Sequence, residues 1–232
     1  MHIRGLQKLT ALDFPDRLAA TIFTGGCNLR CPFCHNASLV LRQDEELKED
    51  DILSFLKKRQ GVLDGVCITG GEPLLQPDIA DFIKKIKELG FLVKLDTNGA
   101  YPEKLKELIS QSLIDYVAMD IKNSPQKYPL TCGFKDKPFE EFFLPFKKSI
   151  NILLEGKVDY EFRTTVVKEL HTVADIEAAG AEITGAKRWF LQCFKDSGDT
   201  ISEGFSEPSK ELLLEMKAKA QNFALHCDLR GI

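Results

Sequence analysis

Short apolar segments alternate with longer amphipathic segments along most of this chain. The short segments are rich in β-branched and other apolar residues, which is typical of buried strands. The strands predicted in this way are 17–23, 65–69, 91–96, 116–120, 160–166 and 188–193. Their alternation with helical segments predicts repeated βα units around a parallel sheet.

The segments between these strands have helical periodicity. Apolar residues within 79–89 recur at three- and four-residue spacing, with lysine and glutamate on the opposite face, and Gly90 follows as a helix-ending residue would. Two further helices are predicted near Pro102 and Pro208, with proline in the first turn. The segment 123–137 is rich in proline and polar residues and predicts an irregular loop after the fourth strand.

The number of units sets the predicted architecture. A complete eight-stranded barrel needs about 250 residues, so six units in 232 residues predict an α/β fold that is an incomplete (βα)6 TIM-like barrel with a parallel sheet. We expect one domain over residues 1–232, with a core at about 17–195 and a helical or extended tail at about 196–232. The open side of such a barrel leaves room for a large substrate, including a protein.

Composition and charge narrow the class of protein. The hydrophobic share of 44%, the charged share of 28% and the formal net charge of −4 are ordinary for a globular protein and argue against a broad nucleic-acid surface. The first residues have no basic segment followed by an apolar one, and no apolar stretch approaches the roughly 20 residues that span a bilayer. We therefore expect a cytoplasmic protein without nucleic-acid or membrane partners.

The cysteines are the strongest chemical signal. Three of the seven, Cys27, Cys31 and Cys34, stand in a C-x3-C-x2-C pattern directly after the first predicted strand. Thiolates are the soft ligands of iron–sulfur clusters, and three of them leave one iron of a four-iron cubane without a protein ligand. The pattern predicts one [4Fe–4S] cluster with an open iron. The remaining four, interpreted as buried or incidental thiols, are Cys67, Cys132, Cys193 and Cys227.

Two other metal sites are compatible with the same cysteines. A structural zinc ion needs four ligands, and His35 is a candidate for the fourth, although adjacent side chains such as Cys34 and His35 rarely reach one ion comfortably. A closed electron-transfer cluster would need a fourth thiol, for which Cys67 is the candidate. In that second case Cys67→Ala would destroy the cluster.

With an aromatic residue before its third cysteine, the pattern resembles the signature of the radical S-adenosylmethionine enzymes. The resemblance implies that S-adenosylmethionine binds the open iron through its amino and carboxylate groups. One-electron reduction then cleaves its sulfonium to a 5′-deoxyadenosyl radical. It also implies that Phe33 lies against the adenine and that backbone near His35 and Asn36 contacts the adenine edge.

Residues at the ends of the next strands extend the resemblance. Gly70-Gly71-Glu72-Pro73 resembles the family's GGE motif, in which glycines allow close backbone approach and Glu72 orders the loop or accepts from the cofactor's ammonium group. Asp96-Thr97-Asn98-Gly99 and Asp120-Ile121-Lys122 resemble the DTNG and D-x-K motifs of glycyl-radical-enzyme activating enzymes. A carboxylate that ends a strand often only caps a helix, but two on consecutive strands converge.

The resemblance assigns roles to these residues. Asp96 and Asp120 would bind a monovalent cation, together with the carbonyls of Thr97 and Ala118, because hard oxygen ligands suit such an ion. Further contacts with S-adenosylmethionine or the substrate are implied for Asn98, Lys122, Arg163 and Gln192. Related activating enzymes often have a histidine near the position of Gln192.

The likeness also covers the segment before the cysteines. Residues 5–15 and 24–28 resemble the leader of anaerobic ribonucleoside-triphosphate reductase-activating proteins. This implies an oxidoreductase that installs a glycyl radical on that reductase, with a flavodoxin or ferredoxin as electron donor. The alternatives are an activase of another glycyl radical enzyme, such as pyruvate formate-lyase, and a small-molecule enzyme similar to 7-carboxy-7-deazaguanine synthase.

Overall fold

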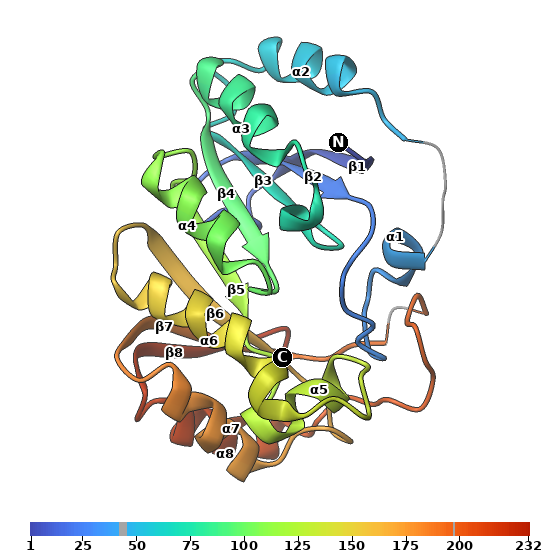
Figure 1. The fold of residues 1–232 in the computed structure, drawn as a ribbon, viewed down its shortest axis with the longest axis vertical. Coiled ribbons are helices and arrows are strands. Elements are labelled where there is room, and N and C mark those ends of the chain that lie inside the picture. The colour runs from blue at the N-terminus through green and yellow to red at the C-terminus, as the bar shows by residue number, and fades with distance from the viewer. Residues whose placement is uncertain (42–45, 197) are drawn as a thin grey trace.

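A computed structural model describes residues 1–41, 46–196 and 198–232 (Figure 1). In this part of the chain one eight-stranded sheet has the strand order β1 to β8; β1 runs antiparallel to β2, and all other neighbours are parallel. The strands are β1 (Ile3–Thr10), β2 (Ala19–Thr24), β3 (Gly65–Gly70), β4 (Leu92–Thr97), β5 (Tyr116–Asp120), β6 (Asp159–Val166), β7 (Ala186–Cys193) and β8 (Ala224–Arg230).

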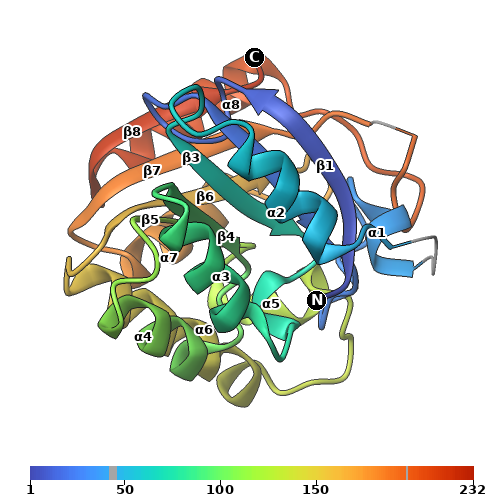
Figure 2. The same ribbon diagram turned by 90° about the horizontal axis from the view of Figure 1, so that it is seen from above.

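The longer helices lie along the outer face of the curved sheet, whereas α1 (Ala37–Leu41) stands apart from it (Figures 1 and 2). Helices follow most of the strands. They are α1 (Ala37–Leu41), α2 (Glu49–Lys57), α3 (Ile79–Glu88), α4 (Pro102–Ser110), α5 (Tyr128–Thr131), α6 (Phe139–Leu154), α7 (Val173–Glu182) and α8 (Lys210–Ala220), with short 3-10 turns at Pro73–Leu75 and Pro125–Lys127. Among the described residues, none of these helices is long and apolar enough to cross a membrane.

The six predicted strands are all present, each within two residues of its predicted limits. Three details differ from prediction. The sheet gains β1 and β8 at its two edges, so the C-terminal tail contributes a seventh parallel strand. Pro208 precedes the Ser209 that caps α8, and so lies outside the first turn. The segment 123–137 contains a 3-10 turn and α5 as well as loop.

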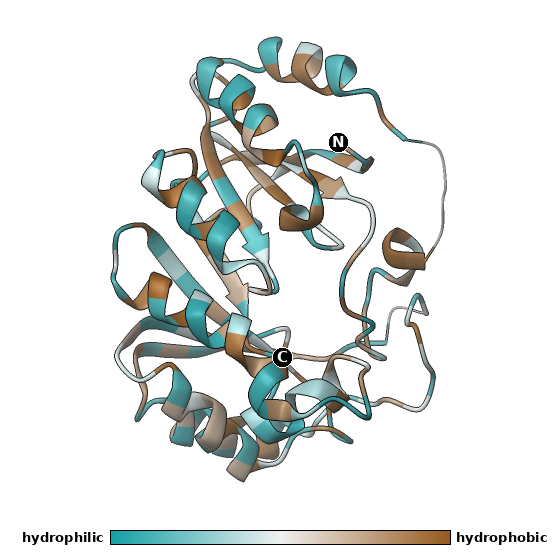
Figure 3. Cartoon of the chain, viewed as in Figure 1, coloured by the Kyte–Doolittle hydropathy of each residue, from teal (hydrophilic) through white to brown (hydrophobic). Residues whose placement is uncertain are grey.

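The main apolar core lies between the sheet and the helices. Side chains alternate along each strand, so Val93 and Leu95 of β4 join this core, while Lys94 and Asp96 point to the inner face of the barrel. The same amphipathic pattern gives the helices their alternating brown and teal segments in Figure 3. The inner face is therefore polar, and the carboxyl ends of the parallel strands meet at one edge of it.

Candidate active site

The three cysteines of the C-x3-C-x2-C pattern line a single cavity of about 290 Å³ at the carboxyl ends of the strands. Their loop follows β2 and is fixed by backbone hydrogen bonds to distant segments. Gly25 donates to the carbonyl of His2 (2.8 Å), Arg30 to that of Cys132 (3.0 Å), and Ser202 to that of Pro32 (2.9 Å). The loop is thus held by β1, by the segment after β5 and by the tail.

The same cavity collects nearly all the predicted site residues. Cys27, Cys31 and Cys34 share it with the ends of β3 to β7, as expected where parallel strands end together. The other predicted residues that line it are Phe33, His35, Asn36, Gly70, Gly71, Asp96, Thr97, Asn98, Asp120, Lys122, Arg163 and Gln192. The residues that line it without having been predicted are Leu29, Val40, Thr69 and Thr165.

Glu72 does not line the cavity. It is fully buried, and its carboxylate accepts hydrogen bonds from the Leu74 amide (3.0 Å), the Thr97 hydroxyl (2.8 Å) and the Asn98 amide (2.7 Å). Burial raises the pKa of this carboxyl to about 7, against the opposing effect of these donors. Of the two predicted roles for Glu72, the structure favours ordering of the loops after β3 and β4.

Gly71 brings the loop after β3 into contact with the start of the cysteine loop. The Glu72 amide donates to the Gly26 carbonyl (2.9 Å), and a Cβ atom placed on Gly71 would lie 1.8 Å from that carbonyl oxygen. No side chain fits at that distance. Glycine is required here because two backbone segments touch.

We expect Gly71→Ala to move the cysteine loop and to lower both the iron content after reconstitution and the affinity for S-adenosylmethionine. Gly5→Ala is the matched control, because a Cβ atom there would meet Phe23 at an ordinary 3.4 Å. Iron analysis and isothermal titration calorimetry would measure the two effects. Equal iron content and affinity in both variants would contradict this reading of the contact.

Buried charges connect the ends of β4, β5 and β6. The Arg163 guanidinium bridges two carboxylates, with Nη1 3.0 Å from Asp96 Oδ2 and Nε 3.1 Å from Asp120 Oδ1. Lys122 Nζ lies 2.8 Å from the other oxygen of Asp120, and Lys94 Nζ donates to Asp96 Oδ1. Burial alone raises the pKa of a carboxyl, but the neighbouring cations outweigh it, lowering the pKa of Asp96 and bringing that of Asp120 to about 2.

Aromatic rings form one wall of the cavity. Phe33 meets Phe194 and Phe205 edge to face, with ring centroids 6.4 Å apart in both pairs, and His35 stacks on Phe194 at 5.0 Å. Burial lowers the pKa of His35, which favours the neutral, stacking form of the ring. Phe205 belongs to the segment after β7, which also binds the α1 region through Ser38 and Asp199 (Figure 1). Phe194 and Phe205 therefore pack behind Phe33 and His35, the two rings that line the cavity.

The positions of Cys67 and Cys132 bear on whether a fourth thiol could bind the cluster. Cys67 does not line the cavity; it is buried on the inner face, with Sγ 3.7 Å from Asp96 Oδ1. Cys132 is the closer candidate, because its buried thiol lies beside Cys31 and lowers the pKa of the Cys31 thiol. Sequence reasoning missed this neighbour, since nothing in the segment 123–137 marks it. Among the described residues, no three His, Cys, Asp or Glu side chains are grouped to hold a single metal ion.

The three loop thiols form a soft donor set in one cavity, which fits a cluster whose irons take one thiolate each. We expect Cys132→Ala, like Cys67→Ala, to keep its [4Fe–4S] cluster and the change that S-adenosylmethionine causes in the cluster's electron paramagnetic resonance spectrum. Cys31→Ala is the positive control and should lose both. Loss of the cluster in Cys132→Ala would indicate a closed, four-thiolate site.

Comparison with known proteins agrees with this geometry. A sequence model described as the Radical SAM superfamily matches residues 21–164. A protein of Methanocaldococcus jannaschii named as a glycyl-radical enzyme activating enzyme is 33% identical over 99% of this chain and 96% of its own length. The pyruvate formate-lyase-activating enzyme of Clostridium pasteurianum is 25% identical over 81% of this chain and 85% of its own.

Solved structures share the fold. Streptococcus suis SuiB bound to S-adenosylmethionine superposes with a TM-score of 0.60 at 15% identity, over 89% of this chain and 48% of the SuiB chain. This chain therefore spans about half of SuiB. The likeness supports the incomplete α/β barrel with a parallel sheet that the sequence predicted.

The chain belongs to the Radical SAM superfamily and is an enzyme of that class. Within the superfamily it belongs with the glycyl-radical enzyme activating enzymes. The family implies S-adenosylmethionine and a [4Fe–4S] cluster as cofactors, and a glycyl radical enzyme as the protein partner.

Proposed function

We propose that the cavity at the carboxyl ends of the strands holds both cofactors, with the cluster on Cys27, Cys31 and Cys34. The observation that carries the proposal is that all three thiols and the polar ends of β3 to β7 line one cavity. The bound, reduced cluster would supply one electron for cleavage of S-adenosylmethionine into methionine and a 5′-deoxyadenosyl radical, which would take a hydrogen atom from a glycine Cα of the partner to give 5′-deoxyadenosine and the glycyl radical.

The residues around the thiols have complementary tasks in this proposal. The glycines of the loop after β3 let the backbone approach the cofactor. The side-chain amide of Asn98 donates from Nδ2 to Asn28 Oδ1 (2.9 Å) and so fixes the cysteine loop. In the proposal, Lys122 and Arg163 face the carboxylate or the ribose of S-adenosylmethionine, and Gln192 contacts either this cofactor or the substrate. The residues proposed at the adenine are Phe33, His35 and Asn36.

Anaerobic ribonucleoside-triphosphate reductase is the partner we propose. Its support is the likeness of residues 5–15 and 24–28 to the leader of its activating proteins. A flavodoxin or ferredoxin would deliver the electron. Pyruvate formate-lyase is the second candidate, because one relative that matches most of this chain is named as its activating enzyme.

A direct assay separates these partners. The chain is reconstituted anaerobically with iron and sulfide, reduced with dithionite or reduced flavodoxin, and assayed for 5′-deoxyadenosine. Each candidate partner is then added, and a glycyl doublet is sought by electron paramagnetic resonance. We expect the doublet with the reductase and a much weaker one with pyruvate formate-lyase. A stronger doublet with pyruvate formate-lyase than with the reductase would make pyruvate formate-lyase the proposed partner. If the enzyme with a fully loaded cluster forms no 5′-deoxyadenosine, the radical chemistry itself is refuted.

The monovalent cation implied at Asp96 and Asp120 fits the described residues poorly. All four carboxylate oxygens already accept hydrogen bonds from Lys94, Arg163 or Lys122. An added cation would lie close to these three cationic side chains, which is electrostatically unfavourable.

A further inference from the structure

We propose that the ammonium group of Lys94 takes the place of the monovalent cation, so that this enzyme binds S-adenosylmethionine without added sodium or potassium. Lys94 lies on β4 two residues before Asp96, so both side chains point to the inner face of the barrel. Only 2% of the Lys94 side chain is exposed, and its Nζ atom donates to Asp96 Oδ1.

Because Lys94 is buried, its ammonium group needs a negatively charged partner nearby. A lysine almost never lies fully buried unless it is paired, because removing its charge from water is costly. Lys94 Nζ also lies 3.8 Å from Cys67 Sγ, and Cys67 is as buried as the lysine. Asp96 is therefore the carboxylate that holds this charge inside the barrel.

The charged side chains around Asp96 and Asp120 already carry more positive than negative charge. Lys94, Arg163 and Lys122 give three positive charges against the two negative charges of Asp96 and Asp120, a net charge of +1. Without Lys94 the group would be neutral, and Asp96 Oδ1 would keep the weak Cys67 thiol as a hydrogen-bond donor. A sodium or potassium ion beside the present ammonium group would add like charge at close range, which is unfavourable.

Lys94 acts through Asp96 in this proposal, since it does not line the cavity. Lys94 is therefore a positioning residue: it holds the Asp96 carboxylate in place and makes the net charge of this group positive next to the proposed cofactor. The inference rests on the proposed placement of S-adenosylmethionine among the strand ends. Its test therefore includes one readout that does not depend on that placement.

The first readout is affinity. Reconstituted enzyme is titrated anaerobically with S-adenosylmethionine in potassium, sodium and choline chloride at equal ionic strength. We expect the dissociation constant of the native enzyme to agree within about twofold in the three salts, and that of Lys94→Gln to be at least about tenfold weaker in choline but largely restored by potassium or sodium. A native enzyme that needs potassium or sodium, or a Lys94→Gln enzyme indifferent to the salt, would overturn the proposal.

The second readout is thermal stability in the same salts without S-adenosylmethionine. We expect the native melting temperature to be independent of the cation, and that of Lys94→Gln to rise in potassium or sodium relative to choline. If the native enzyme binds no S-adenosylmethionine in any salt, the proposed placement fails, while this readout still decides the role of Lys94.

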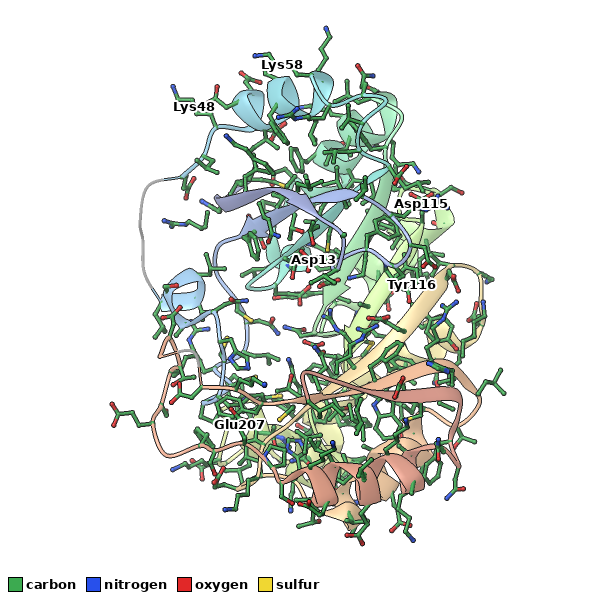
Figure 4. All side chains as sticks on the ribbon, turned by 180° about the vertical axis from the view of Figure 1, so that it is seen from behind. Asp13, Lys48, Lys58, Asp115, Tyr116 and Glu207 are labelled. Carbon is green, nitrogen blue, oxygen red and sulfur yellow. The ribbon has the colours of Figure 1, made fainter. Side chains whose placement is uncertain are left out.

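Two further variants complete the design. Lys87→Gln is the control, because it removes a lysine whose ion pair lies away from the cavity. Lys87 pairs with Asp115 at 2.7 Å, and Asp115, labelled in Figure 4, directly precedes β5. This variant should show no dependence on the cation. Lys94→Arg keeps the charge and serves if Lys94→Gln does not fold. It should behave like the native enzyme, and a new need for potassium or sodium in Lys94→Arg would also overturn the proposal.

Discussion

Replacing Arg163 by methionine is expected to lower the melting temperature by roughly 6–12 °C and to weaken the binding of S-adenosylmethionine. Arg163 bridges Asp96 and Asp120 with only 16% of its side chain exposed. Removing one partner of a buried ion pair costs about 3–5 kcal/mol, because the other charge stays buried. The lower end of that range applies, since Lys94 and Lys122 still pair with the two carboxylates.

The matched control is Arg188→Met on the neighbouring strand β7. Arg188 pairs with Asp159 at 3.2 Å, but 37% of its side chain is exposed, and surface ion pairs contribute about 0–1 kcal/mol. Arg163→Lys should fall between the two, because a lysine keeps the charge but cannot bridge both carboxylates with a planar guanidinium. Scanning fluorimetry and calorimetry would measure stability and affinity. Equal melting temperatures for Arg163→Met and Arg188→Met would contradict a bridging role.

The sequence carried most of the information on the sheet. Strands β2 to β7 are apolar on at least one face, and the helices between them follow a regular period, so both were predictable from pattern alone. The strand β1 was missed because IRGLQKLT mixes polar and apolar residues and lies at a sheet edge, where six of its eight residues are partly or fully exposed. The strand β8 is similarly mixed, and its place beside β7 comes from pairing across the chain.

The cavity residues were predictable for a topological reason. Parallel strands end at one edge, so motifs that follow successive strands must converge. Contacts made beneath that edge were not predictable. Glu72 turns away from the cavity, and Cys132 reaches Cys31 from a loop without a motif. In β4 the charged residues Lys94 and Asp96 alternate with the apolar residues Val93 and Leu95, and this alternation indicates charges on the inner face.

If the cofactor binds where we propose, stability and cofactor binding depend on the same buried groups. Paired charges lie on the inner face of the barrel beside the cavity, although well-packed apolar residues in place of a buried ion pair are often neutral or stabilising. Carboxylates and cations held there are already desolvated and oriented before the cofactor enters. Substitutions that alter one of them should change stability and affinity together, whereas surface ion pairs should change neither much.

Glu72→Ala is expected to destabilise the protein by at least about 3 kcal/mol, because three buried hydrogen-bond donors lose their acceptor at about 1–3 kcal/mol each. Those donors are the Leu74 and Asn98 amides and the Thr97 hydroxyl, which join the loops after β3 and β4. The loops should then separate, and the iron content after reconstitution should fall with the melting temperature. A Glu72→Ala protein as stable as the native one would show that these hydrogen bonds do not hold the loops.

Glu72→Gln separates the charge of this residue from its shape through the dependence on pH. The folded pKa of about 7 lies above the ordinary glutamate pKa of 4.5, so the folded state binds the proton more tightly. This stabilising contribution is complete below pH 4.5 and is lost as the pH rises through 7. Between about pH 5 and pH 7.5 the native protein should therefore lose about 2 kcal/mol that Glu72→Gln, which cannot ionise, retains. Thermal denaturation of both proteins across this range tests the expectation, and parallel pH profiles would mean that Glu72 is ionised throughout.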